Sequence, residues 1–337
     1  MTPEQLALGD AVRGVIDRHG ADAWPHLCRD IGVAGLVIPE RFGGLGASLA
    51  DAAAVLEALG RDLTAAPMLG SAVLAVQALL AAGDTAACER LLPGVAAGDR
   101  TLAVAWAGRD GRWAFPAVQA RPALTGAAHY VLDGCTADTL LVAASTADGD
   151  ALYEVSPEAP GVRRELVTTL DATRRLAVVS FDGATGARLD TAPGFLARVR
   201  DVACAALSAE QVGAAARALE RTVAYSLQRV QFGRPIGAFQ ALAHRMADLH
   251  VLVESARSAS WAAVRADPQE LTLLAAVAKV HCSEALMQVA GEMIQLHGGI
   301  AITWEHDAHR YLRRAYGDAQ LFGSPADHIA RVWASIA

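Results

Sequence analysis

Lysine is almost absent from this chain of 337 residues: Lys279 is the only one, so nearly all of the 29 basic side chains are arginines. The arginines form no basic run, and 36 acidic residues bring the formal net charge to -7. An acidic chain without a basic patch suits neither nucleic acid nor an anionic membrane surface. We therefore predict neither as a partner.

Paired cysteines and long apolar runs are also missing. The cysteines are five in number and have no paired spacing, which points to neither a disulfide framework nor a zinc site. Although 53% of the residues are hydrophobic, no unbroken run reaches the roughly 18 apolar residues of a membrane span. The first residues contain no basic segment followed by an apolar one, so we expect no signal peptide and a cytoplasmic location.

The sequence pattern divides the chain into three regions. Over residues 1–100 apolar residues recur at helical spacing, as at Val55, Leu56 and Leu59. Over 101–190 short alternating or β-branched runs are separated by Asp-Gly, Gly or Pro, which favours antiparallel strands and tight turns. Over 191–337 the pattern is helical again. We predict a mainly α protein with an N-terminal helical domain (1–100), a middle antiparallel β domain (101–190) and a C-terminal helical bundle (191–337).

The same patterns predict individual elements. Strands are expected at 102–106, 129–132, 139–143 and 177–181, with turns at the Asp-Gly pairs 110–111, 133–134, 148–149 and 182–183. Helices are expected at about 195–230, 238–265, 269–296 and 305–317, followed by a short one at 325–336. Long helices with short connections pack most simply as an antiparallel four-helix bundle.

Three motifs carry glycines or arginines in close order. Residues 229–240 read Arg-Val-Gln-Phe-Gly-Arg-Pro-Ile-Gly-Ala-Phe-Gln, and residues 295–300 read Gln-Leu-His-Gly-Gly-Ile. Near the N-terminus, residues 37–46 read Val-Ile-Pro-Glu-Arg-Phe-Gly-Gly-Leu-Gly. Motifs of this composition are typical of sites where backbone or guanidinium groups approach a phosphate.

Each residue of these motifs has a functional and a purely structural interpretation. Arg229 offers a fork of donors that suits phosphate oxygens, or a cation that offsets the dipole at a helix end. The ring of Phe232 could stack on an adenine or anchor a loop. Gly298 and Gly299 could let the backbone approach a pyrophosphate or simply cap a helix, and His297 more simply ends that helix.

In order and spacing the three motifs resemble those of the acyl-CoA dehydrogenase flavoproteins, and the resemblance covers nearly the whole chain. It implies FAD as the cofactor, mainly carried by a neighbouring subunit, and hence an oligomer. The residues that would hold this FAD are Arg229, Phe232, Gln240, Gln295, Gly298 and Gly299.

The chain departs from the family where the chemistry takes place. The carboxylate that removes the α-proton is replaced by Phe322, and the second position that supplies it in other branches is Ala203, beside Cys204. A family loop that reaches the flavin ring, Thr-Glu-Pro-x-x-Gly-Ser-Asp, is replaced by Ala103–Asp110, so the chain's own ring site looks compromised. We therefore assign this chain no catalytic residue and no metal. The nearest carboxylates in sequence are Glu210 and Asp318, more simply solvated or capping groups, and Glu305, which more simply opens a helix.

This combination resembles the β-type subunits of actinobacterial α2β2 steroid side-chain acyl-CoA dehydrogenases. The resemblance implies an α-type partner that carries the catalytic Glu, an acyl-CoA thioester as substrate and electron-transfer flavoprotein as acceptor. Two alternatives remain: a self-sufficient homo-oligomeric flavoprotein of altered chemistry, such as a reductase or oxygen-using enzyme, and a non-catalytic assembly protein.

Overall fold

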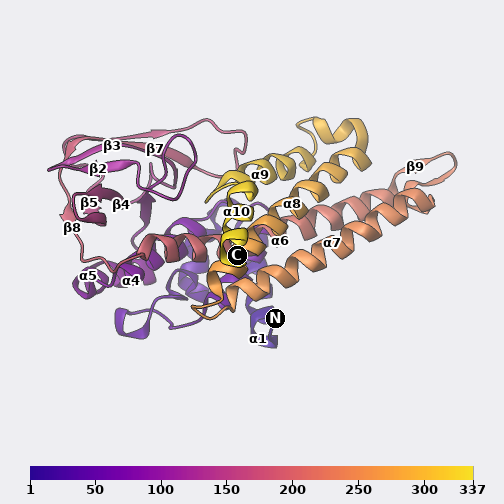
Figure 1. The fold of residues 1–337 in the computed structure, drawn as a ribbon. Coiled ribbons are helices and arrows are strands. Elements are labelled where there is room, and N and C mark those ends of the chain that lie inside the picture. The colour runs from indigo at the N-terminus through magenta and orange to yellow at the C-terminus, as the bar shows by residue number, and fades with distance from the viewer. Residues whose placement is uncertain (337) are drawn as a thin grey trace.

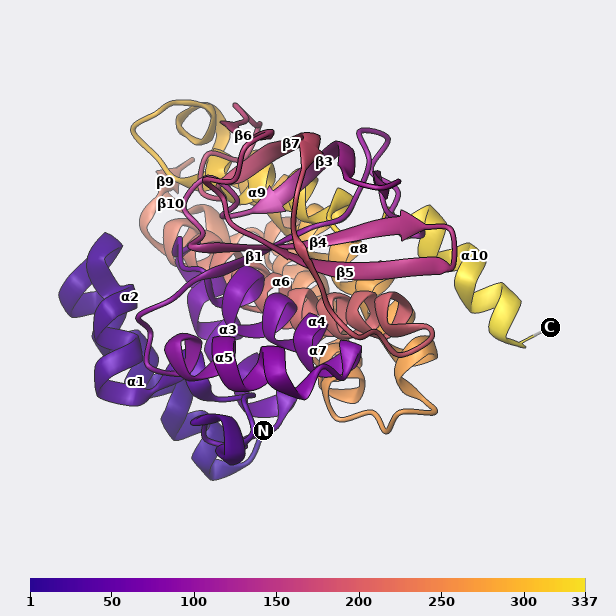
Figure 2. The same ribbon diagram turned by 90° about the vertical axis from the view of Figure 1, so that its left-hand side faces the viewer.

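Helices, a β-sheet and a bundle of long helices make up the computed structural model, which describes residues 1–336 (Figure 1). The sheet lies over one end of the long C-terminal helices, and a small hairpin projects at their other end (Figure 1). In the turned view the N-terminal helices lie below the sheet and in front of the bundle (Figure 2). The predicted fold class is confirmed.

The N-terminal region is helical because its short apolar runs are well capped. Thr2 and Gln5 form a capping box at the start of α1, and Ser48 and Asp51 form another at the start of α3. Shorter 3-10 and π turns connect the helices. The elements are α1 (Pro3–His19), η1 (Gly20–Asp22), α2 (Ala23–His26), η2 (Leu27–Ile31), η3 (Val33–Gly35), η4 (Glu40–Phe42), α3 (Leu49–Arg61), η5 (Met68–Ala75), α4 (Val76–Ala82) and α5 (Thr85–Ala96).

Two glycines let α3 cross the long helix α6 (Phe195–Gln228) backbone to backbone. A Cβ on Gly60 would lie 2.1 Å from the carbonyl oxygen of Glu210, and a Cβ on Gly213 would lie 2.0 Å from that of Glu57. Any larger residue at either position would force the helices apart. This crossing fixes the position of Glu210 beneath the sheet.

The middle region forms one mixed sheet rather than a purely antiparallel one. Its path is β6-β7-β3-β2-β4-β5-β8, with β1 paired to β4 off this path. The strands are β1 (Leu102–Ala105), β2 (Val118–Ala120), β3 (Leu124–Leu132), β4 (Thr139–Thr146), β5 (Gly149–Val155), β6 (Val162–Leu166), β7 (Leu176–Ala184) and β8 (Ala187–Arg188).

Two parallel pairings correct the antiparallel prediction. β1 pairs with residues 139–142 of β4 and β2 pairs with residues 144–145, both in parallel. The other edge of β4 is occupied by β5, so β1 and β2 lie one after the other along the same edge. Residues 106–117 loop out between them. The direction in which β2 pairs with β4 depends on the path of this long loop, and no local sequence pattern specifies that path.

The Asp-Gly pairs have different roles. Turns form at Asp133–Gly134 and at Gly108–Gly111, where the Gly111 amide donates to the Gly108 carbonyl at 3.0 Å. Gly149 follows the turn at Asp148 as the first residue of β5. The prediction is wrong for residues 182–183, which lie inside β7. There Gly183, with φ +67°, is the extra residue of a bulge, since Leu124 pairs with Ala184 and Thr125 with Asp182.

The C-terminal helices end within three residues of their predicted bounds. They are α6, α7 (Gln240–Val264), α8 (Leu271–His297), α9 (Ala308–Gln320) and α10 (Pro325–Ile336). A hairpin of β9 (Val230–Gln231) and β10 (Arg234–Pro235), followed by η6 (Ile236–Ala238), joins α6 to α7, and η7 (Gly298–Ile302) follows α8. In Figure 1 α6, α7 and α8 run side by side.

One segment, Leu271–Ile302, is long and apolar enough to cross a membrane by length and composition alone, with a mean hydropathy of 1.2 over its best window. Most of that window, 56%, is buried within the protein. The segment is α8 with η7, and α8 packs against α6, α7, α9 and α10. Its apolar composition is therefore explained by its place at the centre of the bundle.

Candidate functional site

The first of the C-terminal motifs forms the tip of the bundle, at the far end from the sheet (Figure 1). Arg229 is the exposed C-cap of α6, and its amide donates to the Tyr225 carbonyl at 2.9 Å. Phe232, at the turn of the hairpin, has φ +53° and is 92% exposed. Gln240, also exposed, begins α7. These three predicted cofactor residues therefore lie in one short segment of surface.

The second motif ends α8. His297 is the last helical residue, as predicted, and Gly298 follows with φ +66°. A Cβ on Gly298 or Gly299 would meet no atom within 4 Å, so the backbone here faces open space. Gln295 is exposed one turn earlier. An open, side-chain-free backbone is what close approach by a bulky anion requires.

A ring stack holds the two motifs at the same end of the bundle. The Tyr225 ring lies on the His297 ring with centroids 4.3 Å apart and planes 23° apart, and its hydroxyl donates to the His297 carbonyl at 3.3 Å. Since Arg229 follows Tyr225 by one helical turn and Gly298 follows His297 directly, the stack brings the motifs together. The contact between the two rings was not predicted from sequence, because Tyr225 and His297 are 72 residues apart.

The residues at this end fit one half of a dinucleotide. Arg229 supplies a guanidinium for phosphate oxygens, the paired glycines supply open backbone, and Phe232 supplies a free ring face for an adenine. Exposed apolar side chains surround the tip, namely Val223, Leu227 and Val230. All six predicted residues are exposed, so a second chain would be needed to enclose a cofactor held here. Their role in binding stays a prediction.

The position at which the family resemblance implies a base, Phe322, lies among aromatic rings. Phe322, fully buried with φ +63°, packs edge to face on Trp113 with centroids 4.9 Å apart. Trp113 in turn packs edge to face on Trp106, 5.5 Å away. Both tryptophans are buried and belong to the loop between β1 and β2. We call Trp106, Trp113 and Phe322 the aromatic cluster.

The second position at which the resemblance implies a base, Ala203, also has no ionisable group. Ala203 is fully buried in α6, and Cys204 beside it lies 3.7 Å from Nε2 of His328. Burial raises the pKa of the Cys204 thiol to about 12 and lowers the pKa of His328 to about 4. His328 donates from Nε2 to the Phe322 carbonyl at 3.0 Å, and its Nδ1 accepts from Arg331. The pair is therefore neutral and structural near pH 7.

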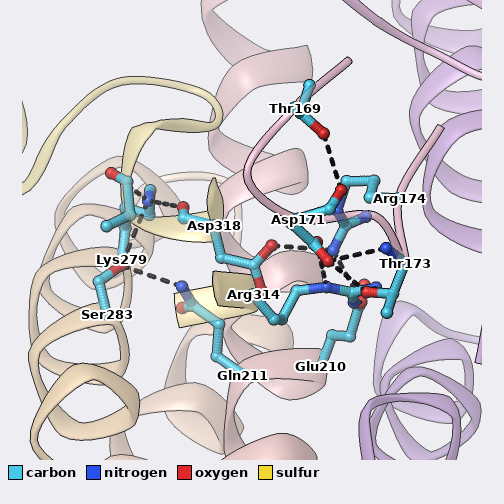
Figure 3. A network of polar contacts seen from close by, with 11 residues as sticks. Thr169, Asp171, Thr173, Arg174, Glu210, Gln211, Lys279, Ser283, Arg314 and Asp318 are labelled. Carbon is cyan, nitrogen blue, oxygen red and sulfur yellow. Dashed lines mark hydrogen bonds and ion pairs between the residues drawn. The ribbon is translucent and has the colours of Figure 1, made fainter. Parts of the chain in front are cut away.

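Glu210 and Asp318 belong to a buried network of ion pairs between the sheet and the bundle (Figure 3). Arg174, from the loop before β7, pairs with Glu210 at 2.7 Å and with Asp318 at 2.9 Å. Arg314 pairs with Asp171 at 2.7 Å and also with Glu210. The five side chains converge from the middle region, α6 and α9, as Figure 3 shows.

This network corrects the interpretation of both carboxylates as solvated or capping groups. Each is buried and paired with arginine, Glu210 with Arg174 and Arg314 and Asp318 with Arg174, which favours a structural role for both. Desolvation raises the pKa of Asp318 to about 6, against the pull of Arg174 and Arg314. Glu305 is exposed in the turn before α9, whose N-cap is Asp307, so it does not open that helix.

The single lysine caps the end of α9. Nζ of Lys279, fully buried in α8, donates to the carbonyls of Asp318 at 2.6 Å and Ala319 at 3.0 Å and to Oγ of Ser283 at 3.2 Å. A cation at a helix C-terminus is favourable, although burial lowers the pKa of Lys279 to about 8. The residue thus holds the segment that leads into Phe322.

Two cavities flank the network. One of about 270 Å³ lies toward the N-terminal helices and is lined by Glu210 and Arg314, and one of about 380 Å³ lies beside Tyr130 and Leu321. Arg174 lines both. The Arg174 side chain is therefore part of the wall of both cavities.

Comparison with protein families matches both ends of the chain. The acyl-CoA dehydrogenase N-terminal domain matches residues 2–99, and the acyl-CoA dehydrogenase C-terminal domain matches residues 201–335. The two matches flank the sheet and include all the predicted cofactor residues.

Individual relatives extend over the whole chain. The acyl-CoA dehydrogenase IpdE2 of Mycolicibacterium smegmatis is 42% identical over 336 residues, covering 99% of this chain and 94% of that protein. In the crystal structure of the ChsE4-ChsE5 complex from Mycobacterium tuberculosis, one chain matches with a TM-score of 0.91 and 28% identity, covering 100% of this chain and 98% of that one. A variant of the steroid acyl-CoA dehydrogenase Tcur3481-Tcur3483 matches with a TM-score of 0.88 and 29% identity, over 99% of this chain and 97% of that one.

Proposed function

The chain belongs to the acyl-CoA dehydrogenase family of FAD-dependent oxidoreductases, and on that premise we propose that it is the β-type subunit of a heteromeric enzyme. In this role the tip formed by Arg229, Phe232, Gln240, Gln295, Gly298 and Gly299 holds the pyrophosphate and adenosine end of an FAD whose flavin ring lies in a partner subunit. The partner supplies the glutamate that removes the α-proton.

The contrast between the two ends of the bundle carries this proposal. At the tip every predicted cofactor residue is present, exposed and gathered by the Tyr225–His297 stack. Near the sheet, Phe322 of the aromatic cluster stands where the family resemblance implies the base, and Glu210 and Asp318 are paired with arginines. A chain that keeps half of a cofactor site and fills its own catalytic position is suited to complete a neighbour's site.

The similar structures support a heteromeric assembly and a steroid acyl group. One is a complex of two differently named proteins, ChsE4 and ChsE5, and another is described as a steroid acyl-CoA dehydrogenase. By analogy the substrate is an acyl-CoA thioester with a steroid side chain, and electron-transfer flavoprotein accepts the electrons. When bound, FAD receives the hydride that leaves the β-carbon of the thioester.

The visible spectrum tests the proposal most directly. The chain is purified alone and after co-expression with an α-type acyl-CoA dehydrogenase from the same genome, and flavin is quantified per chain. We expect a colourless lone chain and about one FAD per pair. One FAD per lone chain would instead support the self-sufficient flavoprotein, and no flavin with the partner would support the assembly protein.

Arginine variants test the tip itself. Arg229→Ala in the pair removes a charge-assisted contact to phosphate, worth about 1.5–3 kcal/mol, and so weakens FAD binding by about 10- to 100-fold. Arg198→Ala is the matched control, because Arg198 is also exposed on α6 but lies at the opposite end of the helix. Equal FAD affinity in the two variants would contradict the assignment of Arg229.

A further inference from the structure

Large apolar side chains are exposed together on α9 and on the segment that joins α8 to α9. Ile302 is 75% exposed, Trp304 is 79% exposed and Tyr316 is 52% exposed, and Leu170 from the loop between β6 and β7 joins them. They line a groove of about 310 Å³. Scattered apolar residues are normal on a protein surface, but a contiguous group around a groove marks a contact site. We call Leu170, Ile302, Trp304, Arg313 and Tyr316 the α8–α9 surface.

Contacts within the α8–α9 surface fix the orientation of its tryptophan side chain. The Arg313 guanidinium lies 4.7 Å from the centroid of the Trp304 ring, and His309 packs edge-on against the same ring at 4.7 Å. These contacts fix the indole before binding, which reduces the entropy that association must lose. Tryptophan, tyrosine and arginine are also the residues that most often dominate interface energies.

Arg313 lacks a carboxylate of its own. On α9 the neighbouring arginines are paired, Arg310 with Asp307 and Arg314 with Asp171 and Glu210. Within the described part of the chain no acidic group pairs with Arg313. The α8–α9 surface therefore offers an apolar groove with an unpaired cation at its edge, and it is complementary to an apolar side chain flanked by a carboxylate.

The surface is continuous with the predicted cofactor residues. Ile300, 40% exposed, directly follows Gly299, and Ile302 and Trp304 follow within four more residues. Any chain whose FAD reaches Gly298 and Gly299 must lie against the residues that come next. This continuity singles out the flavin-bearing chain as the occupant.

We propose that the α8–α9 surface is the main apolar contact between this chain and its flavin-bearing acyl-CoA dehydrogenase partner. The inference rests on the proposed function and adds to it the side of the molecule on which the partner sits. The partner contributes an apolar side chain to the groove beside Trp304 and a carboxylate to Arg313.

Dissociation of the co-expressed pair on dilution, followed by mass photometry, tests this inference. Trp304→Ala raises the dissociation constant by about 30-fold or more, as expected for an interface hot spot. Trp333→Ala is the matched control, since Trp333 is 65% exposed on α10, which ends on the opposite side of the molecule (Figure 2). It leaves the dissociation constant unchanged. Ile302→Glu, at a site that is 75% exposed, and Arg313→Glu also raise the dissociation constant.

The outcomes separate this inference from the proposed function. Circular dichroism and melting of each lone variant first establish that it folds. A pair that forms with one FAD and resists all three substitutions on the α8–α9 surface overturns the inference and leaves the proposed function standing. A lone chain that binds FAD as a homo-oligomer, and that Trp304→Ala converts to monomers, overturns both and assigns the surface to a second copy.

Discussion

The indole of Trp113 meets the ring of Phe322 edge to face, with centroids 4.9 Å apart and planes 70° apart. Trp113 comes from the loop between β1 and β2, and Phe322 from the turn after α9. Because Trp113 also packs on Trp106, the aromatic cluster links the altered ring-site loop to the position at which the base is lost. Restoring a carboxylate alone would place it against the buried indole of Trp113 rather than beside a substrate.

Phe322→Glu therefore destabilises the protein without creating an active site. It exchanges a buried aromatic pair for a polar group that has no partner, which costs about 3–4 kcal/mol. Phe322→Leu keeps the site apolar and costs about 1–2 kcal/mol. Urea unfolding of both variants measures the difference, and a Phe322→Glu protein as stable as Phe322→Leu would show that the position is open to solvent.

Arg314 is expected to be the most sensitive member of the buried network. Arg314→Met strands the carboxylates of Asp171 and Glu210 and lowers the free energy of unfolding by about 3–5 kcal/mol. Arg310→Met, which breaks an exposed pair with Asp307, costs about 0–1 kcal/mol. The midpoints of urea unfolding report both, and similar midpoints would mean that the network is wetter than its burial implies.

His328 gives the stability a defined dependence on pH. Its pKa is about 4 in the folded chain, lowered first by burial and then by Arg331, Lys279 and Arg200, against about 6.5 in an unfolded chain. Between these two pKa values His328 binds a proton in the unfolded state but not in the folded state. The free energy of unfolding therefore falls as pH drops from about 6.5 toward 4.

The size of this effect follows from the linkage between protonation and folding, and reaches about 2–3 kcal/mol. His328→Gln keeps a donor for the Phe322 carbonyl but does not titrate, so its free energy of unfolding falls less over the same range. Carboxylates such as Asp171 contribute equally to both proteins and cancel in the comparison. Parallel stability curves for the two proteins would refute the assignment.

The burial of Lys279 can be read from its reactivity. In the folded chain an amine-reactive reagent leaves Lys279 unmodified, because all three of its ammonium donors are engaged inside the bundle. Unfolding in urea exposes this amine. Intact mass spectrometry then shows one further added group, and fast modification of Lys279 under native conditions would contradict the cap on α9.

Helix positions could be predicted from sequence because they depend on local periodicity. α6 to α10 follow apolar residues at helical spacing, and the largest difference is at α9, which begins and ends three residues later than predicted, since Glu305 belongs to the turn before it. The parallel pairing of β1 and β2 with β4 could not be predicted, because alternation specifies a strand but not its direction.

Cofactor residues could be predicted from sequence because they lie in two short motifs with fixed spacing, and their role in binding stays a prediction. The buried network was missed because its members are far apart: Arg174 is 36 residues from Glu210 and 144 from Asp318. A carboxylate in a helical pattern looks solvated until the residue across from it is known. The aromatic cluster was not predicted for the same reason, because Trp113 and Phe322 are far apart in the sequence.

The exposure of Phe232 and of the paired glycines bears on how long the cofactor stays bound. Since Phe232 and the paired glycines are open to solvent in this chain, in the proposed pair they can hold their end of the FAD only for as long as the two chains stay in contact. Dilution then inactivates the enzyme in proportion to dissociation. Recovery follows second-order kinetics in protein, and excess flavin cannot replace the missing chain.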